Sequence, residues 1–266
     1  MKSNQRFSRS VMAVTVVVVG LMTAGTIQGA QADEQIIPVN TNAYGNTYGQ
    51  WSARWWQWLL SIPMATNPNF DTTGANCAQK QAGPVWFLAA TFGGSAVTRS
   101  CTVPAGKALF VPILTSIFGA GAGDCDPTNP GVLCNLADLR VTTAGALDSV
   151  TLTASIDDQS LANLRHQRVQ SPALTITYPV GAVFGVNAGT DAPNVSDGYW
   201  LMVPPLPAGQ HTIHFKGVFT GGPSKGTVIE VTDHLTVQGG NKSWPTAPRS
   251  THLCCAGNRL TLSQAL

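Results

Sequence analysis

The chain has 266 residues, of which only 11% are charged, while glycine (27) and proline (17) are frequent. Its formal net charge of +2 comes from its N-terminus, because the first 32 residues hold three of the 15 basic residues and no acid. The remainder therefore carries 12 basic and 13 acidic residues, a net charge of −1. Nucleic acids and anionic membrane surfaces bind clustered lysine and arginine. The composition thus excludes both as expected partners.

The first 32 residues have the pattern of a secretory signal peptide. Lys2, Arg6 and Arg9 precede the apolar run VMAVTVVVVGLMTAG at 11–25, and small residues follow at Ala30 and Ala32. The apolar run has 15 residues, fewer than the roughly 20 that a transmembrane helix needs, although an uncleaved N-terminal anchor is the alternative. We expect a secreted or periplasmic protein with no transmembrane segment in its mature chain, 33–266.

A tryptophan-rich segment, GQWSARWWQWLLSIP, holds four of the seven tryptophans and follows a polar stretch, 33–50, that we expect to be an extended arm. On a helical wheel Trp51, Trp55 and Trp58 share one stripe, and Pro63 stops the helix expected over 51–62. A sugar-binding platform, a membrane-seeking patch and a piece of core are the alternatives. Because a helix that is apolar over most of its circumference is usually buried, the pattern favours core.

Seven further segments have strand patterns and are separated by turn sequences such as FGGS, PAGK and TGGPSKG: 83–92, 107–118, 149–157, 173–179, 198–206, 210–219 and 226–237. The pattern predicts an all-β protein, a β-sandwich of about seven or more strands in one domain over 51–240, with a C-terminal tail at 241–266. Three of the segments are apolar at both parities, so both of their faces should be covered. The simplest cover is the tryptophan-rich helix, packed on the outside of one sheet.

All six cysteines lie in the predicted mature chain, and an even count in an exported protein favours disulfides. Cys125 and Cys134 would close the loop CDPTNPGVLC, while Cys77 and Cys101 would bracket a strand and a turn. The two cysteines at 254 and 255 are adjacent, so they should have different partners. In the first loop the oxygen ligands of Asp124, Asp126 and Asn129 suit calcium, but no EF-hand pattern is met and a turn is favoured.

The last hairpin holds most of the candidate site residues. Placing Lys216 opposite Glu230 pairs opposite charges and puts His214, Glu230 and His234 on one polar face, where they could hold a metal or a small anion. The same register puts His211 and Asp233 on the inner face as a possible catalytic pair. Ordinary surface residues and a structural pair are the respective alternatives.

A second candidate is the turn SDGYW, where Trp200 could stack on a ligand, although packing in the core is the alternative. Familiar hydrolase motifs such as HExxH and SxxK do not occur, and the only glutamates are Glu34 and Glu230, whereas a glycosidase needs two placed carboxylates.

The stretches YGQWSARWWQWLLSIP, DTTGANC, GPVWFLAATFGGSAVTRSCTVPAGKALFVPIL and DGYWLMVPPLPAGQHTIHF resemble a recurrent group of exported bacterial proteins. The resemblance covers roughly 44–219 and implies one bacterial domain, but it carries over no catalytic residue. We therefore expect a non-catalytic exported protein that binds an extracellular ligand, glycan or protein. A polysaccharide- or polymer-active hydrolase and a metal-binding protein are the alternatives. The sequence indicates no cofactor and no oligomeric state.

Overall fold

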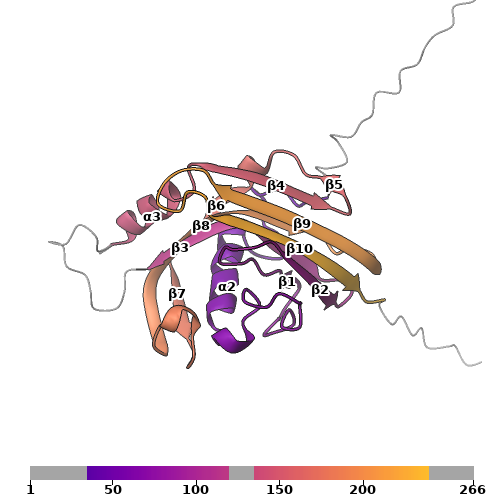
Figure 1. Ribbon diagram of the computed structural model, residues 1–266, viewed down its shortest axis with the longest axis horizontal. Coiled ribbons are helices and arrows are strands. Elements are labelled where there is room, and N and C mark those ends of the chain that lie inside the picture. The colour runs from indigo at the N-terminus through magenta and orange to yellow at the C-terminus, as the bar shows by residue number, and fades with distance from the viewer. Residues whose placement is uncertain (1–34, 120–134, 240–266) are drawn as a thin grey trace, which may run out of the picture.

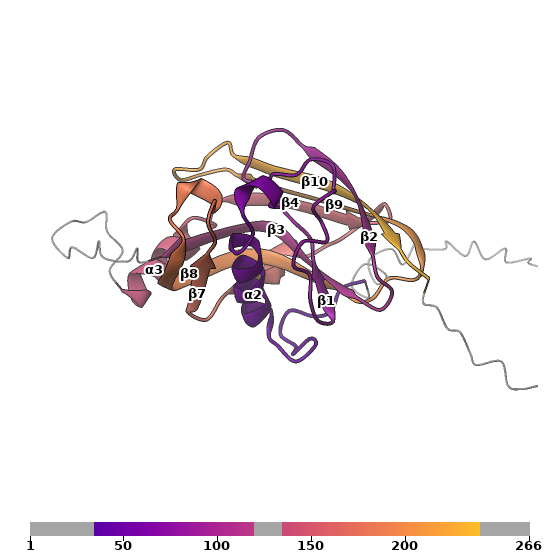
Figure 2. The same ribbon diagram turned by 90° about the horizontal axis from the view of Figure 1, so that it is seen from below.

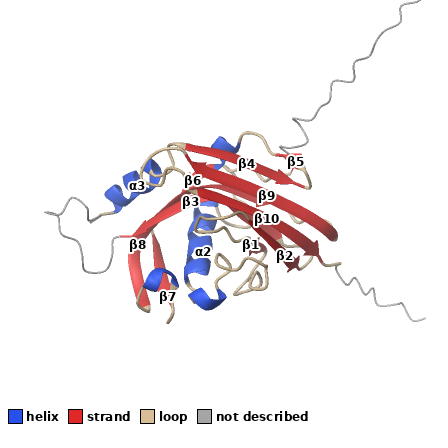
Figure 3. Cartoon of the chain, viewed as in Figure 1, coloured by secondary structure: helices blue, strands red, loops and turns tan. Residues whose placement is uncertain are grey.

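The computed structural model describes residues 35–119 and 135–239, which form two five-stranded sheets and a covering helix (Figures 1 and 3). The first sheet has the order β1 (Val85–Phe87), β3 (Ala108–Gly119), β8 (Gly189–Val203) and β6 (Arg168–Gln170), and β7 (Leu174–Tyr178) also pairs with β8. The second has the order β2 (Val97–Val103), β10 (Val228–Val237), β9 (Gly209–Phe219), β4 (Val150–Ile156) and β5 (Gln159–Ser160). The expected β-rich architecture with an N-terminal helix is confirmed.

Helix α2 (Tyr48–Leu60) is the tryptophan-rich segment, and it begins three residues earlier than predicted. Its N-terminus is a capping box, in which the Thr47 hydroxyl accepts from the Gln50 amide and the Gln50 side chain accepts from the Thr47 amide. The end of the predicted arm therefore belongs to the helix. A second helix that the sequence did not indicate, α3 (Leu136–Gly145), starts at the N-cap Asn135.

All four tryptophans of α2 are buried, and each indole N–H donates a hydrogen bond inside the protein. Trp51 donates to Ala43 O at 2.7 Å, Trp55 to Leu88 O at 2.8 Å, Trp58 to Gln79 O at 2.8 Å and Trp56 to Thr115 Oγ1 at 3.3 Å. A buried indole needs such a partner. The prediction that this segment is core, and neither a sugar platform nor a membrane patch, is confirmed.

The helix lies on the first sheet, on the side away from the second sheet (Figures 1 and 2). The predicted double coverage is confirmed in β3, where 108–114 are all buried, and in β8, where 195–203 are all buried. The two sheets meet closely at Gly217 of β9, because a Cβ atom there would lie 2.7 Å from the Leu114 side chain of β3. Only glycine fits at this contact.

The predicted strand over 83–92 is mostly irregular, since β1 ends at Phe87. The reason is Arg99, whose guanidinium takes the carbonyls of Ala89 and Ala90, at 2.8 Å each, that a strand would use for its ladder. Arg99 itself lies in β2, which the sequence did not indicate. The predicted disulfide between Cys77 and Cys101 is present and ties the loop before β1 to β2.

The register predicted for the last hairpin is confirmed, because Glu230 pairs with Lys216 and Thr232 with His214 across β10 and β9. The odd-numbered side chains Ile213, Phe215 and Val231 are buried, as expected for the inner face. Within the described ranges no helix combines the length and the apolar character needed to cross a bilayer.

Candidate functional site

The polar face of the β9–β10 hairpin is closed by its own side chains. Lys216 Nζ lies 2.9 Å from Glu230 Oε2, and His214 Nε2 lies 3.4 Å from Glu230 Oε1. The bond from Lys216, followed by that from His214, holds the pKa of Glu230 below its ordinary value, so this carboxylate stays ionised. Both of its oxygens are thus already occupied by neighbours on the hairpin.

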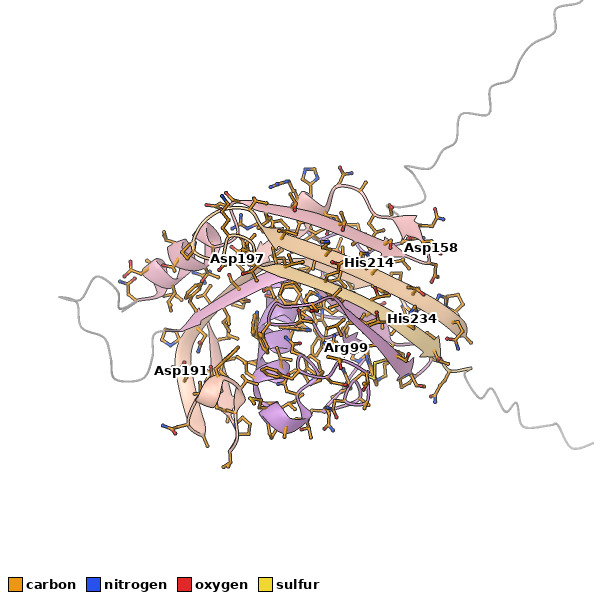
Figure 4. The ribbon with its side chains drawn as sticks, in the orientation of Figure 1. Arg99, Asp158, Asp191, Asp197, His214 and His234 are labelled. Carbon is orange, nitrogen blue, oxygen red and sulfur yellow. A yellow bond between two sulfur atoms is a disulfide. The ribbon has the colours of Figure 1, made fainter. Side chains whose placement is uncertain are left out.

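The two histidines proposed to share a ligand on this face have different partners. His234 Nδ1 lies 3.2 Å from Thr212 Oγ1, whereas His214 contacts Glu230. Figure 4 shows His214 and His234 at separate places on the sheet of β9 and β10. Among the residues that the structure describes, no three His, Cys, Asp or Glu side chains gather closely enough to hold a metal.

The proposed catalytic pair of His211 and Asp233 is wrong. His211 Nδ1 lies 2.7 Å from Asp157 Oδ2 and its Nε2 lies 2.9 Å from Pro207 O, so both ring nitrogens are engaged elsewhere. Asp157 stands in the turn after β4, and its other oxygen accepts from the Thr212 amide at 2.8 Å. Burial lowers the pKa of His211, but the bonds to Asp157 and Pro207 O and the charge of Asp157 together outweigh this effect and raise the pKa above its ordinary value.

Trp200 is not an exposed stacking platform. Its side chain is fully buried in β8 and stacks on Phe110 with a centroid distance of 4.9 Å and an interplanar angle of 7°. The Trp55 ring of α2 meets it edge-on at 5.3 Å. The turn residue that the sequence suggested for a ligand therefore joins the helix to the sheet, which is the alternative expected above.

Several predictions, among them the signal peptide at 1–32, fall outside the described residues. The disulfide between Cys125 and Cys134 and the oxygen ligands Asp124, Asp126 and Asn129 all lie in 120–134. Cys254 and Cys255 lie in 240–266, so their pairing also falls outside the described residues. These remain predictions.

A site that the sequence did not predict lies beside α2, where side chains of the helix, of β3 and of the last hairpin line one pocket. A cavity of about 160 Å³ is lined by Trp55 and Trp56 of the helix, Leu114 of β3, and Phe219 and Ile229 of the last hairpin. The segments around Asn69 and 90–92 complete its wall. A concave, mainly apolar pocket with a few polar groups is the usual form of a ligand site, and this one is smaller than the roughly 300–1,000 Å³ of sites for drug-sized ligands.

Asn69 is the polar group that distinguishes this cavity. Its side chain is 5% exposed, and its Oδ1 is buried without a hydrogen bond from any described residue. Its neighbour Asn67 is also buried but is satisfied, since Nδ2 donates to Leu59 O at 2.7 Å and to Ile62 O at 3.2 Å. Asn67 Oδ1 also accepts from the Asn69 amide at 3.0 Å. The end of α2 therefore fixes the backbone at Asn69, while the side chain at the cavity stays unpartnered.

Arg99 positions two loops that line the cavity. Besides the carbonyls of Ala89 and Ala90, it bonds the carbonyl of Asp71 through Nε at 2.7 Å. The first loop carries Asn69 and the second carries Phe92. Burial lowers the pKa of Arg99, an effect that the charges of Asp233 and Asp71 partly offset. One buried side chain thus holds both loops against β2.

Asp233 of β10 stands opposite Arg99 of β2 in the parallel ladder, and both side chains are 2% exposed. Asp233 Oδ2 is buried without a partner among the described residues. Burial raises the pKa of Asp233 to about 7, against the opposing pull of Arg99. This carboxyl therefore changes its charge near neutral pH in the interior, beside the residue that orders the cavity loops.

The outer edge of the cavity continues into an open depression of about 700 Å³ that shares Asn69, Thr91 and Phe92 with it. Three phenylalanines form a row here, with Phe92 5.1 Å from Phe70 and 4.8 Å from Phe184, and the two outer rings are 44% and 65% exposed. Phe184 has a φ of 59°, a left-handed conformation that is costly for a residue with a side chain. Exposed apolar side chains and strained backbone both occur preferentially at binding sites.

Comparison with protein-family models, with curated proteins and with solved structures finds no match to this chain. Its function therefore has to be inferred from its own residues. The hairpin face that the sequence suggested is satisfied internally, whereas the cavity leaves a buried acceptor open. The sequence around Asn69 does not indicate that its side-chain oxygen is unpartnered, because the surroundings of this oxygen depend on residues of α2, β3 and the hairpin.

Proposed function

We propose that the protein is an exported, disulfide-braced β-sandwich protein that binds a small extracellular ligand in the cavity beside Asn69. The unpartnered Oδ1 of Asn69 in a mainly apolar cavity carries this proposal. A buried acceptor without a partner destabilises the folded chain by about 1–3 kcal/mol. A ligand that donates a hydrogen bond to this oxygen would remove that cost, which gives the residue a function.

Export is part of the proposal. It is supported by the N-terminal signal pattern at 1–32 and by the disulfide between Cys77 and Cys101, since such bonds persist in oxidising compartments. The resemblance to exported bacterial proteins points the same way. A β-sandwich is the closed two-sheet architecture that the two five-stranded sheets support.

A binding role is favoured over the hydrolase alternative by the state of the candidate catalytic groups. Neither ring nitrogen of His211 is available to take a proton from a substrate, because Asp157 and Pro207 engage both. Glu230, the other candidate, is held as an ion pair with Lys216. No observation in the hairpin singles out a nucleophile beside either group.

The proposal is tested by native mass spectrometry of the protein recovered from cells that export it. We expect a mass that corresponds to a chain beginning near residue 33 with a small molecule bound. The mass should also show that the thiols of Cys77 and Cys101 are oxidised to a disulfide. The variant Ala90→Leu places a larger side chain at the cavity wall and should be recovered without that molecule. A full-length chain that stays in the cytoplasm with residues 1–32 uncleaved would disprove export. A hydrolytic activity that is lost in His211→Ala would show that the protein is an enzyme.

A further inference from the structure

We infer that the ligand of this cavity is a neutral molecule with an apolar part about the size of one aromatic ring and a hydrogen-bond donor for Asn69 Oδ1. This inference rests on the proposed binding function and specifies the chemical class of the ligand. Three properties of the cavity lead to it: the absence of charge in its wall, its volume, and the single open acceptor.

The wall of the cavity is uncharged. None of its described lining residues, and none of those lining the adjoining depression, is Asp, Glu, Lys, Arg or His. Moving a charged group from water into such surroundings is strongly unfavourable unless a counter-charge meets it. The cation Arg99 contacts these loops, but its guanidinium is committed to the carbonyls of Asp71, Ala89 and Ala90. Carboxylates, phosphates and ammonium ions are therefore disfavoured.

The volume limits the part of the ligand that enters. The cavity measures about 160 Å³, and an apolar cavity of roughly 150 Å³ is known to accommodate benzene. Its floor consists of the rings of Trp55 and Trp56 with the side chains of Leu114 and Ile229, which suit the faces and edges of a ring. A bulkier group would have to remain in the depression outside, beside Phe70 and Phe92.

Asn69 requires that the ligand carry a donor. Its Oδ1 accepts from no described residue, whereas Thr91 Oγ1 accepts from the Gly93 amide at 3.3 Å. Thr115 Oγ1 accepts from the Trp56 indole at 3.3 Å and donates to Asp197 O at 2.9 Å. A hydroxyl or N–H group on the ring satisfies Asn69, so that a phenol fits this cavity better than an unsubstituted arene.

The test uses the mature protein and four probes at neutral pH: phenol, toluene, benzoate and benzylamine, whose alkyl amine is protonated at that pH. Affinity is measured by isothermal titration calorimetry. We expect phenol to bind about fivefold to tenfold more tightly than toluene, as one neutral hydrogen bond implies. Benzoate and benzylamine should bind at least about tenfold more weakly than phenol, since their charges would be buried unpaired.

Two variants make the assignment specific. Asn69→Leu should bring the phenol affinity down to that of toluene without lowering the melting temperature of the free protein, because the Asn69 side chain makes no hydrogen bond to the described chain. Ala90→Leu should abolish binding of phenol and toluene together. The matched control Asn67→Leu should instead lower the melting temperature, since it removes the bonds to Leu59, Ile62 and the Asn69 amide.

The outcomes separate the two proposals. If benzoate or benzylamine binds most tightly and Ala90→Leu abolishes this, the cavity is a binding site but the ligand class is wrong. If phenol binding is unchanged in Asn69→Leu, the role of Asn69 is wrong. If no probe binds, or if binding persists in Ala90→Leu, the cavity is not the site and the proposed function falls with it.

Discussion

The outer face of the β9–β10 hairpin and the cavity under α2 both carry polar side chains, but in opposite states. On the hairpin, Glu230 is bonded by Lys216 and His214, and Thr212 is bonded to His234. At the cavity, the buried oxygen of Asn69 has no partner in the described chain. The comparison teaches that titratable residues on one face do not by themselves mark a site. A buried polar group left unsatisfied is the stronger indicator.

The largest expected effect tests whether the cavity wall belongs to the core. Trp55→Ala should lower the free energy of unfolding by about 3–5 kcal/mol, because it removes a fully buried ring and its bond to Leu88 O. Urea unfolding followed by circular dichroism measures this change. Arg54→Ala is the matched control on the exposed side of α2 and should cost less than about 1 kcal/mol. A Trp55→Ala protein as stable as the parent would break the comparison, since α2 would then not be core.

The next largest effect is a pH dependence of stability that comes from Asp233, which is buried on the inner face of β10. In the unfolded chain Asp233 titrates near 3.8, whereas burial raises its pKa in the folded protein to about 7. Between these two pH values the folded state binds more protons than the unfolded state. The contribution of Asp233 to stability is therefore fully present below pH 3.8 and is lost as the pH rises to about 7.

Asp233→Asn should remove this pH dependence, because an amide cannot ionise. Since about 1.4 kcal/mol accompanies each tenfold change in proton affinity, we expect the parent to lose a few kcal/mol across the interval and the variant to lose clearly less. Thermal unfolding at a series of pH values measures it. His211 also has a raised pKa and loses its contribution as the pH rises, so His211→Asn is the control for its share. An unchanged slope in Asp233→Asn would refute the assignment.

The smallest effect concerns the hairpin face itself. Glu230→Gln should lower the free energy of unfolding by less than about 1 kcal/mol, because Lys216 is 40% exposed and a surface ion pair contributes little. The loss should shrink further at high salt. Chemical unfolding at low and high salt measures both values. A loss of several kcal/mol, or a loss of ligand binding, would mean that this face is more than a closed surface.

Features written in local sequence could be predicted. The hairpin register follows from two adjacent segments and the charge pair of Lys216 and Glu230, and the helix follows from the stripe of Trp51, Trp55 and Trp58. The disulfide between Cys77 and Cys101 was predicted from their bracketing of a turn. Each of these depends on residues close together in the chain.

Features that depend on residues far apart in the sequence could not be predicted. β2 has the weak pattern VTRSCTV, and it becomes a strand because it pairs in parallel with β10. The segment after Phe87 resembles a strand, but Arg99 takes its carbonyls. The cavity arises only where α2, β3 and the hairpin meet. The sequence around Asn69, NPNF at 67–70, contains nothing that indicates that the side-chain oxygen Oδ1 will lack a hydrogen-bond partner.

The pairing of β2 with β10 also governs when the protein can fold. β2 ends at Val103, but its neighbour in the sheet begins at Val228, near the end of the described chain. Helix α2 likewise cannot pack on its sheet before β8 has been made, because Ser52 of the helix contacts Ser196 of β8, 144 positions later in the sequence. Contacts of such high sequence separation form late and slowly. An emerging chain thus cannot complete either sheet from its N-terminal half, and strands of both sheets stay unpaired until the last strand is made.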